Sequence, residues 1–308
     1  MDLISIVMPE NVDPGEIVTP LADVSRIPRK YLDIPYYDRL YPGDPGRQAL
    51  DIYLPEEGDG PFPVIVFIHG GAFWGGQRRD FQIGHVIEGI LRGYAVVSVG
   101  YRLSDTVKFP DAIYDVKAAV RFLRANAEKY HLDPDRFCAV GASAGAYFAA
   151  MLAVTGGMLP FEDITMGNHE TSDAVQAVIG LFGVYDLFEQ SKFTEASEPA
   201  PGMPKMANWA DLFMGLNCRE HEGLMMLTWP GSYIKPDCPP FLLQAGTGDE
   251  IVPYENTRLL GEMINSVCGE GRAVVDIFEG CAHGDIRFSE KENLDRMFAF
   301  TDAALGRS

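Results

Sequence analysis

One serine stands alone in a stretch of apolar and small residues, CAVGASAGAYFAAMLAV, at residues 138–154. Ser143 lies between Gly141 and Gly145, so the segment fits the pattern Gly-x-Ser-x-Gly. The preceding residues are typical of a buried strand and the following ones of a helix. A tight strand-to-helix turn here would expose the hydroxyl in a strained backbone conformation, with room only for small neighbours. Ser143 is therefore a candidate nucleophile, although a plain glycine-rich connection gives the same pattern.

A second glycine-rich motif, FIHGGAFWGG at residues 67–76, follows directly on an apolar, strand-like run. Catalysis of acyl transfer needs backbone N–H groups that point at a transient oxyanion. We assign this task to the N–H groups of Gly71 and Ala72, together with that of Ala144 directly after the serine. His69 heads the motif. One interpretation makes it a catalytic base, but we favour a structural role in which its ring binds the loop backbone.

Together these motifs resemble the α/β-hydrolase superfamily, and within it the HGG-type esterases and lipases, similar to hormone-sensitive lipase and to acetyl-xylan and feruloyl esterases. The resemblance runs from QALDIYLPE to the end of the chain and includes GYRL, DPDRFCAVGASAG, PPFLLQAGTGDEIVPY and CAHG. It implies an α/β-hydrolase fold and a serine esterase with a Ser-His-Asp triad. One departure is Ala72, where many members have a third glycine, but alanine still supplies an N–H group.

The resemblance also implies the chain order nucleophile, acid, histidine. Three histidines follow Ser143. His169 and His221 lie in polar segments, whereas His283 follows directly on the strand-like run AVVDIF, within the motif CAHG. His283 is therefore the predicted general base.

The acid should lie at the carboxyl end of a strand, beside the serine. Asp249 follows the strand-like run PFLLQAG and is the predicted acid, while its neighbour Glu250 should point elsewhere. Asp186 also ends a strand-like run and is the main rival. Asp285 is too close in sequence to His283 to reach across its ring.

The substrate is less well defined by the sequence. Phe73 and Trp74 in the glycine-rich motif are predicted to line the site, although most aromatic residues near the motifs are expected to pack in the core. The resemblance points to small acyl esters, with acetyl or feruloyl groups on plant carbohydrate as candidates. Such a reaction needs no metal and no organic cofactor.

Two alternatives stay open. An amidase, formamidase or peptidase of the same fold would carry the same motifs. A non-catalytic, ligand-binding protein on this scaffold is disfavoured, because such proteins typically lack a triad residue and Ser143, Asp249 and His283 are all present.

Strand-like and helix-like segments alternate after about residue 47, which predicts a mostly parallel sheet with helices on both faces. We expect a single domain over residues 1–308, with an irregular segment at about 1–40 and a cap-like insertion at about 187–235 over the C-terminal edge of the sheet. Strands are expected at 48–54, 63–70, 94–100, 135–143, 173–183, 240–246 and 272–280, and helices at 81–93, 110–130, 253–268 and 289–304.

Charge, hydrophobicity and cysteine content disfavour several classes of function and location. The net charge of −19 disfavours binding to nucleic acid or to an anionic membrane surface. The N-terminal sequence lacks the basic region of a signal peptide, and no apolar run approaches the about 18 residues of a membrane span. The five cysteines show no CxxC pairing, which favours a reducing compartment, and we predict a cytoplasmic protein. The sequence does not decide whether the protein forms a homo-oligomer.

Overall fold

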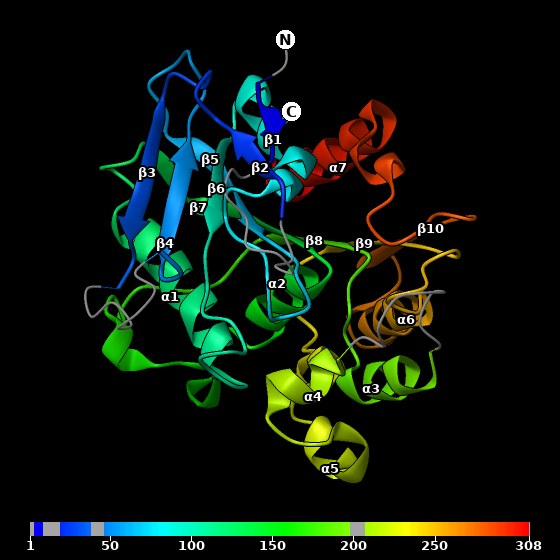
Figure 1. Ribbon diagram of the computed structural model, residues 1–308. Coiled ribbons are helices and arrows are strands. Elements are labelled where there is room, and N and C mark those ends of the chain that lie inside the picture. The colour runs from blue at the N-terminus through cyan, green and yellow to red at the C-terminus, as the bar shows by residue number, and fades with distance from the viewer. Residues whose placement is uncertain (1–2, 9–18, 38–45, 198–206, 308) are drawn as a thin grey trace.

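The computed structural model describes residues 3–8, 19–37, 46–197 and 207–307, and its centre is an eight-stranded sheet (Figure 1). Two edge pairings, of β3 with β4 and of β4 with β6, are antiparallel, and all the other pairings are parallel. In spatial order the strands are β10 (Ala273–Phe278), β9 (Phe241–Gly246), β8 (Ala177–Leu181), β7 (Leu132–Ala142), β5 (Phe62–Ile68), β6 (Ala95–Val99), β4 (Ala49–Tyr53) and β3 (Lys30–Pro35).

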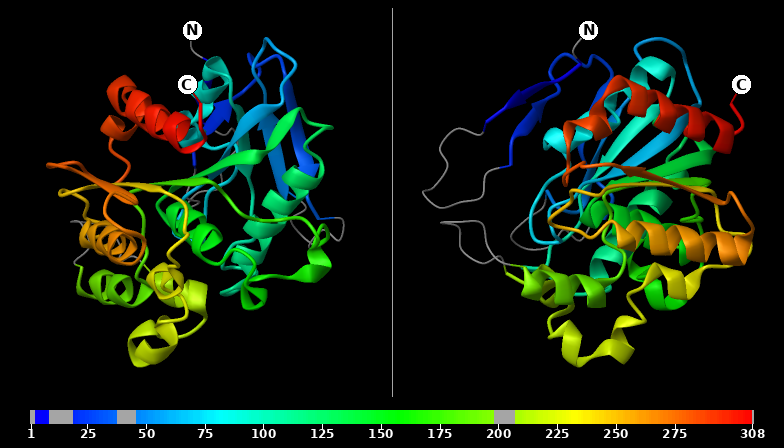
Figure 2. Two further views of the ribbon diagram at one scale, coloured as in Figure 1. Left: turned by 180° about the vertical axis from the view of Figure 1, so that it is seen from behind. Right: turned by 90° about the vertical axis from the view of Figure 1, so that its right-hand side faces the viewer.

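Helices cover both faces of the sheet, as the sequence predicts (Figure 2). Burial of apolar helix and strand surface on each face supplies the main favourable contribution to folding. One face packs against α1 (Asp111–Ala125), α2 (Ala144–Val154) and α6 (Glu255–Cys268). The other face packs against the 3-10 helices η1 (Phe81–His85) and η2 (Ile87–Arg92) and against α7 (Lys291–Ala304). The spacing of four apolar residues in α1 predicts a stripe along one side of the helix, and the structure buries all four: Ile113, Val116, Val120 and Leu123.

Strand β4 is buried on both faces, whereas its alternating sequence predicts one covered face. Leu50 and Ile52 belong to the core on one side of the sheet and Tyr53 to the core on the other. The polar residue between them, Asp51, is also buried and is paired with the Arg79 guanidinium at 2.8 Å. A buried ion pair therefore lets this polar position lie inside the fold.

The segment 81–93 is helical, but it forms two short 3-10 helices where the spacing predicts one helix. Gly84 and Gly89 both lower the α-helical propensity of the segment. A side chain at Gly89 would press on Val96 and Ile65 of the sheet, so close packing requires glycine there. Tertiary packing thus overrides a regular helical pattern.

The region expected to be irregular at 1–40 contains strands in its described part. Besides β3, a two-stranded antiparallel ribbon forms from β1 (Ser5–Val7) and β2 (Leu21–Asp23). Residues 1–2, 9–18 and 38–40 of this region lie outside the described residues.

The segment 187–235 is partly helical, and its residues 198–206 lie outside the described part. The α-helices in its described part lie together at one end of the molecule (Figure 1). They are α3 (Leu187–Ala196), α4 (Trp209–Met214) and α5 (Glu222–Met225). The 3-10 helix η5 (Cys218–Glu220) lies between α4 and α5, and η6 (Pro230–Tyr233) follows α5.

Candidate active site

The turn between β7 and α2 holds Ser143 in a backbone conformation with φ 54° and ψ −118°. Residues with a side chain rarely adopt this conformation, so the surrounding structure must enforce it. The Ser143 N–H donates to the Leu181 carbonyl oxygen at 2.8 Å, which ties the turn to the carboxyl end of β8. Ser143 is partly exposed at the N-terminus of α2, where the helix dipole favours negative charge.

The two glycines of the motif lie where any side chain would overlap the backbone. A Cβ atom at Gly141 would overlap the Gly145 carbonyl, and a Cβ atom at Gly145 would overlap the Ile68 carbonyl at the end of β5. These close approaches allow α2 to begin immediately after the serine. The Gly-x-Ser-x-Gly pattern therefore has a steric cause at this turn.

We expect Gly145→Ala to lower the free energy of unfolding by at least about 3 kcal/mol, because the added methyl group meets main-chain atoms that cannot rotate away. Gly223→Ala is a matched control, since Gly223 also lies in a helix but an added Cβ there meets nothing within 4 Å. It should be neutral or slightly stabilising. Urea unfolding followed by circular dichroism measures both variants. Equal stability of Gly145→Ala and wild type would contradict this account of the turn.

The structure brings Ser143, His283 and Asp249 together from three loops at the carboxyl ends of β7, β10 and β9. The His283 Nε2 atom lies 3.0 Å from the Ser143 Oγ atom, and Nδ1 lies 2.7 Å from Asp249 Oδ2. The other carboxylate oxygen, Oδ1, accepts the N–H groups of Ile251 at 2.9 Å and Val252 at 2.8 Å. The Asp249 side chain is 1% exposed and that of His283 is 16% exposed. This arrangement can transfer a proton from the serine to the imidazole.

The rival acids have other partners. Asp186 caps α3, because its carboxylate accepts the N–H groups of Phe188 and Glu189, both at 3.0 Å. Asp285 pairs with the Arg287 guanidinium, whose hydrogen bonds hold the pKa of the carboxyl well below its usual value.

The other two candidate bases lie away from Ser143. The His169 side chain is 57% exposed and lies 3.4 Å from the Glu170 carboxylate. His221 is also exposed, and its ring contacts the Asn217 carbonyl oxygen at 3.0 Å.

The loop after β5 turns its backbone through three consecutive positive φ angles, 126° at Gly71, 54° at Ala72 and 61° at Phe73. The Gly71 carbonyl oxygen accepts the N–H groups of Trp74 at 3.0 Å and Gly75 at 2.8 Å, so it is engaged within the loop itself. Within the described residues, the N–H groups of Gly71 and Ala72 have no acceptor. These donors are therefore free to bind an anion.

The Ala144 N–H, in the first turn of α2, also has no acceptor among the described residues. Gly70 brings the loop against the serine, because a Cβ atom on Gly70 would lie 3.0 Å from the Ser143 Cβ atom. The free N–H groups of the loop and of the helix N-terminus therefore belong to adjacent segments of backbone.

His69 lies beneath this loop, where it is 1% exposed. Its Nδ1 atom is 2.8 Å from the Gly70 carbonyl oxygen, and its ring stacks on Tyr101 with 4.4 Å between ring centroids. Burial lowers the pKa of His69 to about 4, so the ring is neutral near pH 7. A buried ring bonded to the loop fits the predicted structural role better than that of a base.

The described residues contain neither a cluster suited to a metal ion nor a helix suited to a membrane. No group of three or more histidine, cysteine, aspartate or glutamate side chains comes together there as a metal site. None of the described helices combines the length and the hydrophobicity needed to span a membrane.

Comparison with known proteins matches residues 50–264 to the BD-FAE family. The chain belongs to the BD-FAE family. The matched region includes Ser143 and Asp249 and ends before His283.

Among its curated relatives, esterase LipC of Mycobacterium tuberculosis is 27% identical over 256 residues, which cover 80% of this chain and 59% of LipC. The chain thus spans little more than half the length of this relative. A bifunctional GH43-CE protein of Bacteroides eggerthii has a TM-score of 0.77 and 28% identity, covering 90% of this chain and 35% of that one. A truncated carbohydrate esterase from gut microbiota has a TM-score of 0.78 and 24% identity, covering 91% and 97%. The fold of this BD-FAE member is the α/β-hydrolase fold.

The two aromatic residues predicted to line the site differ in their surroundings. Trp74 is 48% exposed and lines a cavity of about 480 Å³ beside the loop, together with Arg47. Phe73 is only 1% exposed, and its ring stacks on Phe213 of α4 with 4.1 Å between centroids. Phe73 therefore lies in an aromatic cluster behind the loop and does not reach an open surface, because α4 covers it.

Sequence reasoning missed Phe182, the residue after β8. Its ring meets the His283 imidazole edge-on with 4.8 Å between centroids, and it contacts Phe288 at the same separation. Its backbone has a φ of 39°. Nothing in the sequence GLFGVYDL marks this residue, because the contact depends on the paths of two distant loops.

Proposed function

We propose that this BD-FAE member hydrolyses carboxylic esters, with Ser143 as the nucleophile, His283 as the general base and Asp249 as the acid that orients the base. One observation carries the proposal: a continuous hydrogen-bonded chain links the serine hydroxyl, the imidazole and a buried carboxylate, with distances of 3.0 Å and 2.7 Å. A nucleophile bonded to a base that a third group orients is the arrangement that acyl transfer requires.

The mechanism follows from the atoms in contact. His283 Nε2 takes the Ser143 proton as the serine oxygen attacks the ester carbonyl carbon. The Asp249 carboxylate accepts a hydrogen bond from the Nδ1–H group and stays ionised, which fixes the tautomer of the ring and stabilises its charged form. The imidazolium then gives its proton to the leaving alcohol. Water, activated by the same imidazole, attacks the acyl-enzyme and releases the acid and the free serine.

The developing oxyanion is the species that needs stabilisation in both halves of this reaction. We assign this stabilisation to the N–H groups of Gly71, Ala72 and Ala144, which have no acceptor within the described residues and can donate to the oxyanion. Fixed donors of this kind are worth about 3 to 4 kcal/mol each in the transition state. Ala72 has a positive φ, so its methyl group does not prevent the backbone from adopting the conformation that glycine favours.

The substrate class is a small acyl ester, with acetyl or feruloyl groups on carbohydrate as the first candidates. The carbohydrate esterase among the similar structures supports this choice, as does the exposed indole of Trp74 beside the oxyanion loop. A flat aromatic face at this place suits a sugar ring or a feruloyl ring.

We further propose that the chain works as one domain in which 187–235 is a cap. Three contacts support this role. Phe213 stacks on Phe73 of the oxyanion loop, Lys108 donates to the Leu212 carbonyl at 2.7 Å, and Gln190 donates to the Ile251 carbonyl, next to the acid loop, at 2.9 Å.

A substrate panel tests the proposal. We expect p-nitrophenyl acetate and butyrate to be hydrolysed, with kcat/KM falling about tenfold or more for chains of eight carbons and longer. Methyl ferulate and acetylated xylan test the carbohydrate assignment, and an N-formyl amide tests the amidase alternative. Faster turnover of the amide than of any ester would replace the esterase proposal, and no turnover of any substrate would favour a binding protein.

A further inference from the structure

Two of the five cysteines, 30 positions apart in the sequence, lie against one another. The Sγ atoms of Cys238 and Cys268 are 3.1 Å apart. Cys238 precedes β9, and Cys268 is the last residue of α6. A disulfide places its sulfur atoms about 2.0 Å apart, so a shift of about 1 Å would bring this pair to bonding distance. The sequence predicts packing thiols only, because spacing along the chain does not reveal this approach.

The surrounding backbone holds the two thiols in place. The Cys238 N–H and the Cys268 S–H both donate to the carbonyl oxygen of Lys235, each at 3.0 Å. The Arg272 guanidinium donates to the Cys238 carbonyl oxygen at 2.9 Å. Both cysteines are therefore anchored to the same turn, and their proximity does not depend on a chance rotamer of one side chain.

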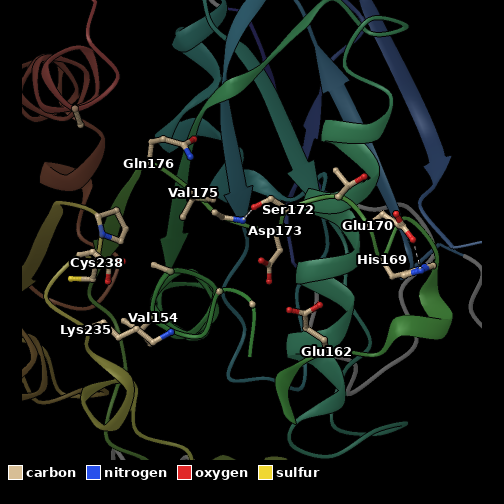
Figure 3. A pocket seen from close by; sticks show the side chains of 18 residues that line it. Val154, Glu162, His169, Glu170, Ser172, Asp173, Val175, Gln176, Lys235 and Cys238 are labelled. Atoms are coloured by element: carbon tan, nitrogen blue, oxygen red, sulfur yellow. Dashed lines mark hydrogen bonds and ion pairs between the residues drawn. The ribbon is translucent and has the colours of Figure 1, made fainter. Parts of the chain in front are cut away.

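The two thiols differ in access. Cys268 is partly exposed, whereas Cys238 is 5% exposed at the wall of a cavity of about 810 Å³. Figure 3 shows Cys238 and Lys235 on one side of this cavity, across from Glu162 and His169. The pKa of the Cys238 thiol is raised mainly by burial and, to a smaller extent, by the hydrogen bond with Cys268. An oxidant in solution therefore meets Cys268 first.

We propose that Cys238 and Cys268 are a modification site that forms an intramolecular disulfide on reaction with a small-molecule disulfide such as oxidised glutathione. The Cys268 thiol loses its proton, and the thiolate attacks one glutathione sulfur, releasing one glutathione thiolate and forming a mixed disulfide. The Cys238 thiol then loses its proton and attacks Cys268 Sγ, which expels the second glutathione. Two protein thiols are oxidised, and one glutathione disulfide is reduced to two glutathione molecules.

The disulfide would close a loop over residues 238–268, which contains β9, Asp249 and α6. A crosslink of this kind restricts the unfolded chain and stabilises the folded one. For a loop of this length in a chain of this size we expect the midpoint of thermal unfolding, Tm, to rise by roughly 2 to 5 °C. The segment 238–268, which contains the candidate triad acid Asp249, would then be covalently closed where its two ends meet.

The test uses the 308-residue chain, treated with oxidised glutathione and then alkylated under denaturing conditions. We expect a mass loss of two hydrogens, no retained glutathione, and a crosslinked peptide pair containing Cys238 and Cys268. Cys138, Cys218 and Cys281 are buried elsewhere, so they should stay reduced during the treatment and be alkylated afterwards. The matched control is the double variant Cys238→Ser/Cys268→Ser, which should neither lose the two hydrogens nor gain Tm on treatment.

Stable glutathionylation of Cys268 without the crosslink would overturn the proposal, as would a crosslink between any other pair. The proposal would also be overturned if Cys238 and Cys268 both stayed reduced after treatment with oxidised glutathione. Mass and Tm are measured without a substrate. Failure of this proposal is therefore distinct from failure of the proposed esterase function.

Discussion

Replacement of Ser143 by alanine is expected to lower kcat for ester hydrolysis by about 10⁵ to 10⁶-fold, because no other group in the proposed mechanism can form the acyl-enzyme. A fluorophosphonate probe, which reacts with an activated serine, should label the wild type and fail to label Ser143→Ala. Stopped assays with p-nitrophenyl acetate measure the loss of kcat, and mass spectrometry measures the labelling. Circular dichroism checks that the variant is folded.

A second serine–histidine pair provides the matched control. The Ser289 Oγ atom lies 2.7 Å from the His85 Nδ1 atom, closer than Ser143 lies to His283. Burial lowers the pKa of His85 to about 4, and no carboxylate bonds its ring within the described residues. Ser289→Ala should therefore retain labelling and keep kcat within a few-fold of wild type. Loss of labelling in Ser289→Ala but not in Ser143→Ala would overturn the assignment.

Much of the fold could be predicted from the sequence because the parallel strands are buried on both faces and read as continuous apolar runs. Strands β5, β6 and β9 lie where the runs PVIVFI, YAVVSV and PFLLQAG predict them. The strand ends matter most, since residues that follow the carboxyl ends of parallel strands meet at one edge of the sheet. The structure brings Ser143, Asp249 and His283 together for this reason, although they are spread over 140 positions of the chain.

The features that could not be predicted depend on contacts between segments that share no local pattern. Phe73 is covered by Phe213, which comes from α4 far along the chain. The approach of Cys238 and Cys268 depends on how α6 returns to the start of β9. Phe182 contacts His283 only because β8 and the loop after β10 end at the same edge of the sheet. Periodicity and motif spacing contain no information about such pairs.

Replacement of Asp249 by asparagine is expected to lower kcat by about 10⁴-fold without unfolding the protein. The reason lies in the two backbone donors of the acid loop. Asp249 Oδ1 accepts the N–H groups of Ile251 and Val252, so the carbonyl oxygen of an asparagine must occupy that place. Its amide nitrogen then faces His283 Nδ1 and donates to it. The ring proton moves to Nε2, which can no longer accept the proton of Ser143.

Asp186→Asn is the matched control for this prediction, because Asp186 is the rival acid and lies in the segment that follows the neighbouring strand β8. Its carboxylate caps α3 through two backbone N–H groups, and asparagine is an equally good N-cap residue. The variant should therefore keep its Tm and keep kcat within a few-fold of wild type. The pH dependence of kcat gives an independent readout, since Asp249→Asn should regain activity at high pH, where hydroxide can take the Ser143 proton in place of the imidazole. A large loss of kcat in Asp186→Asn with little loss in Asp249→Asn would reverse the assignment of the acid.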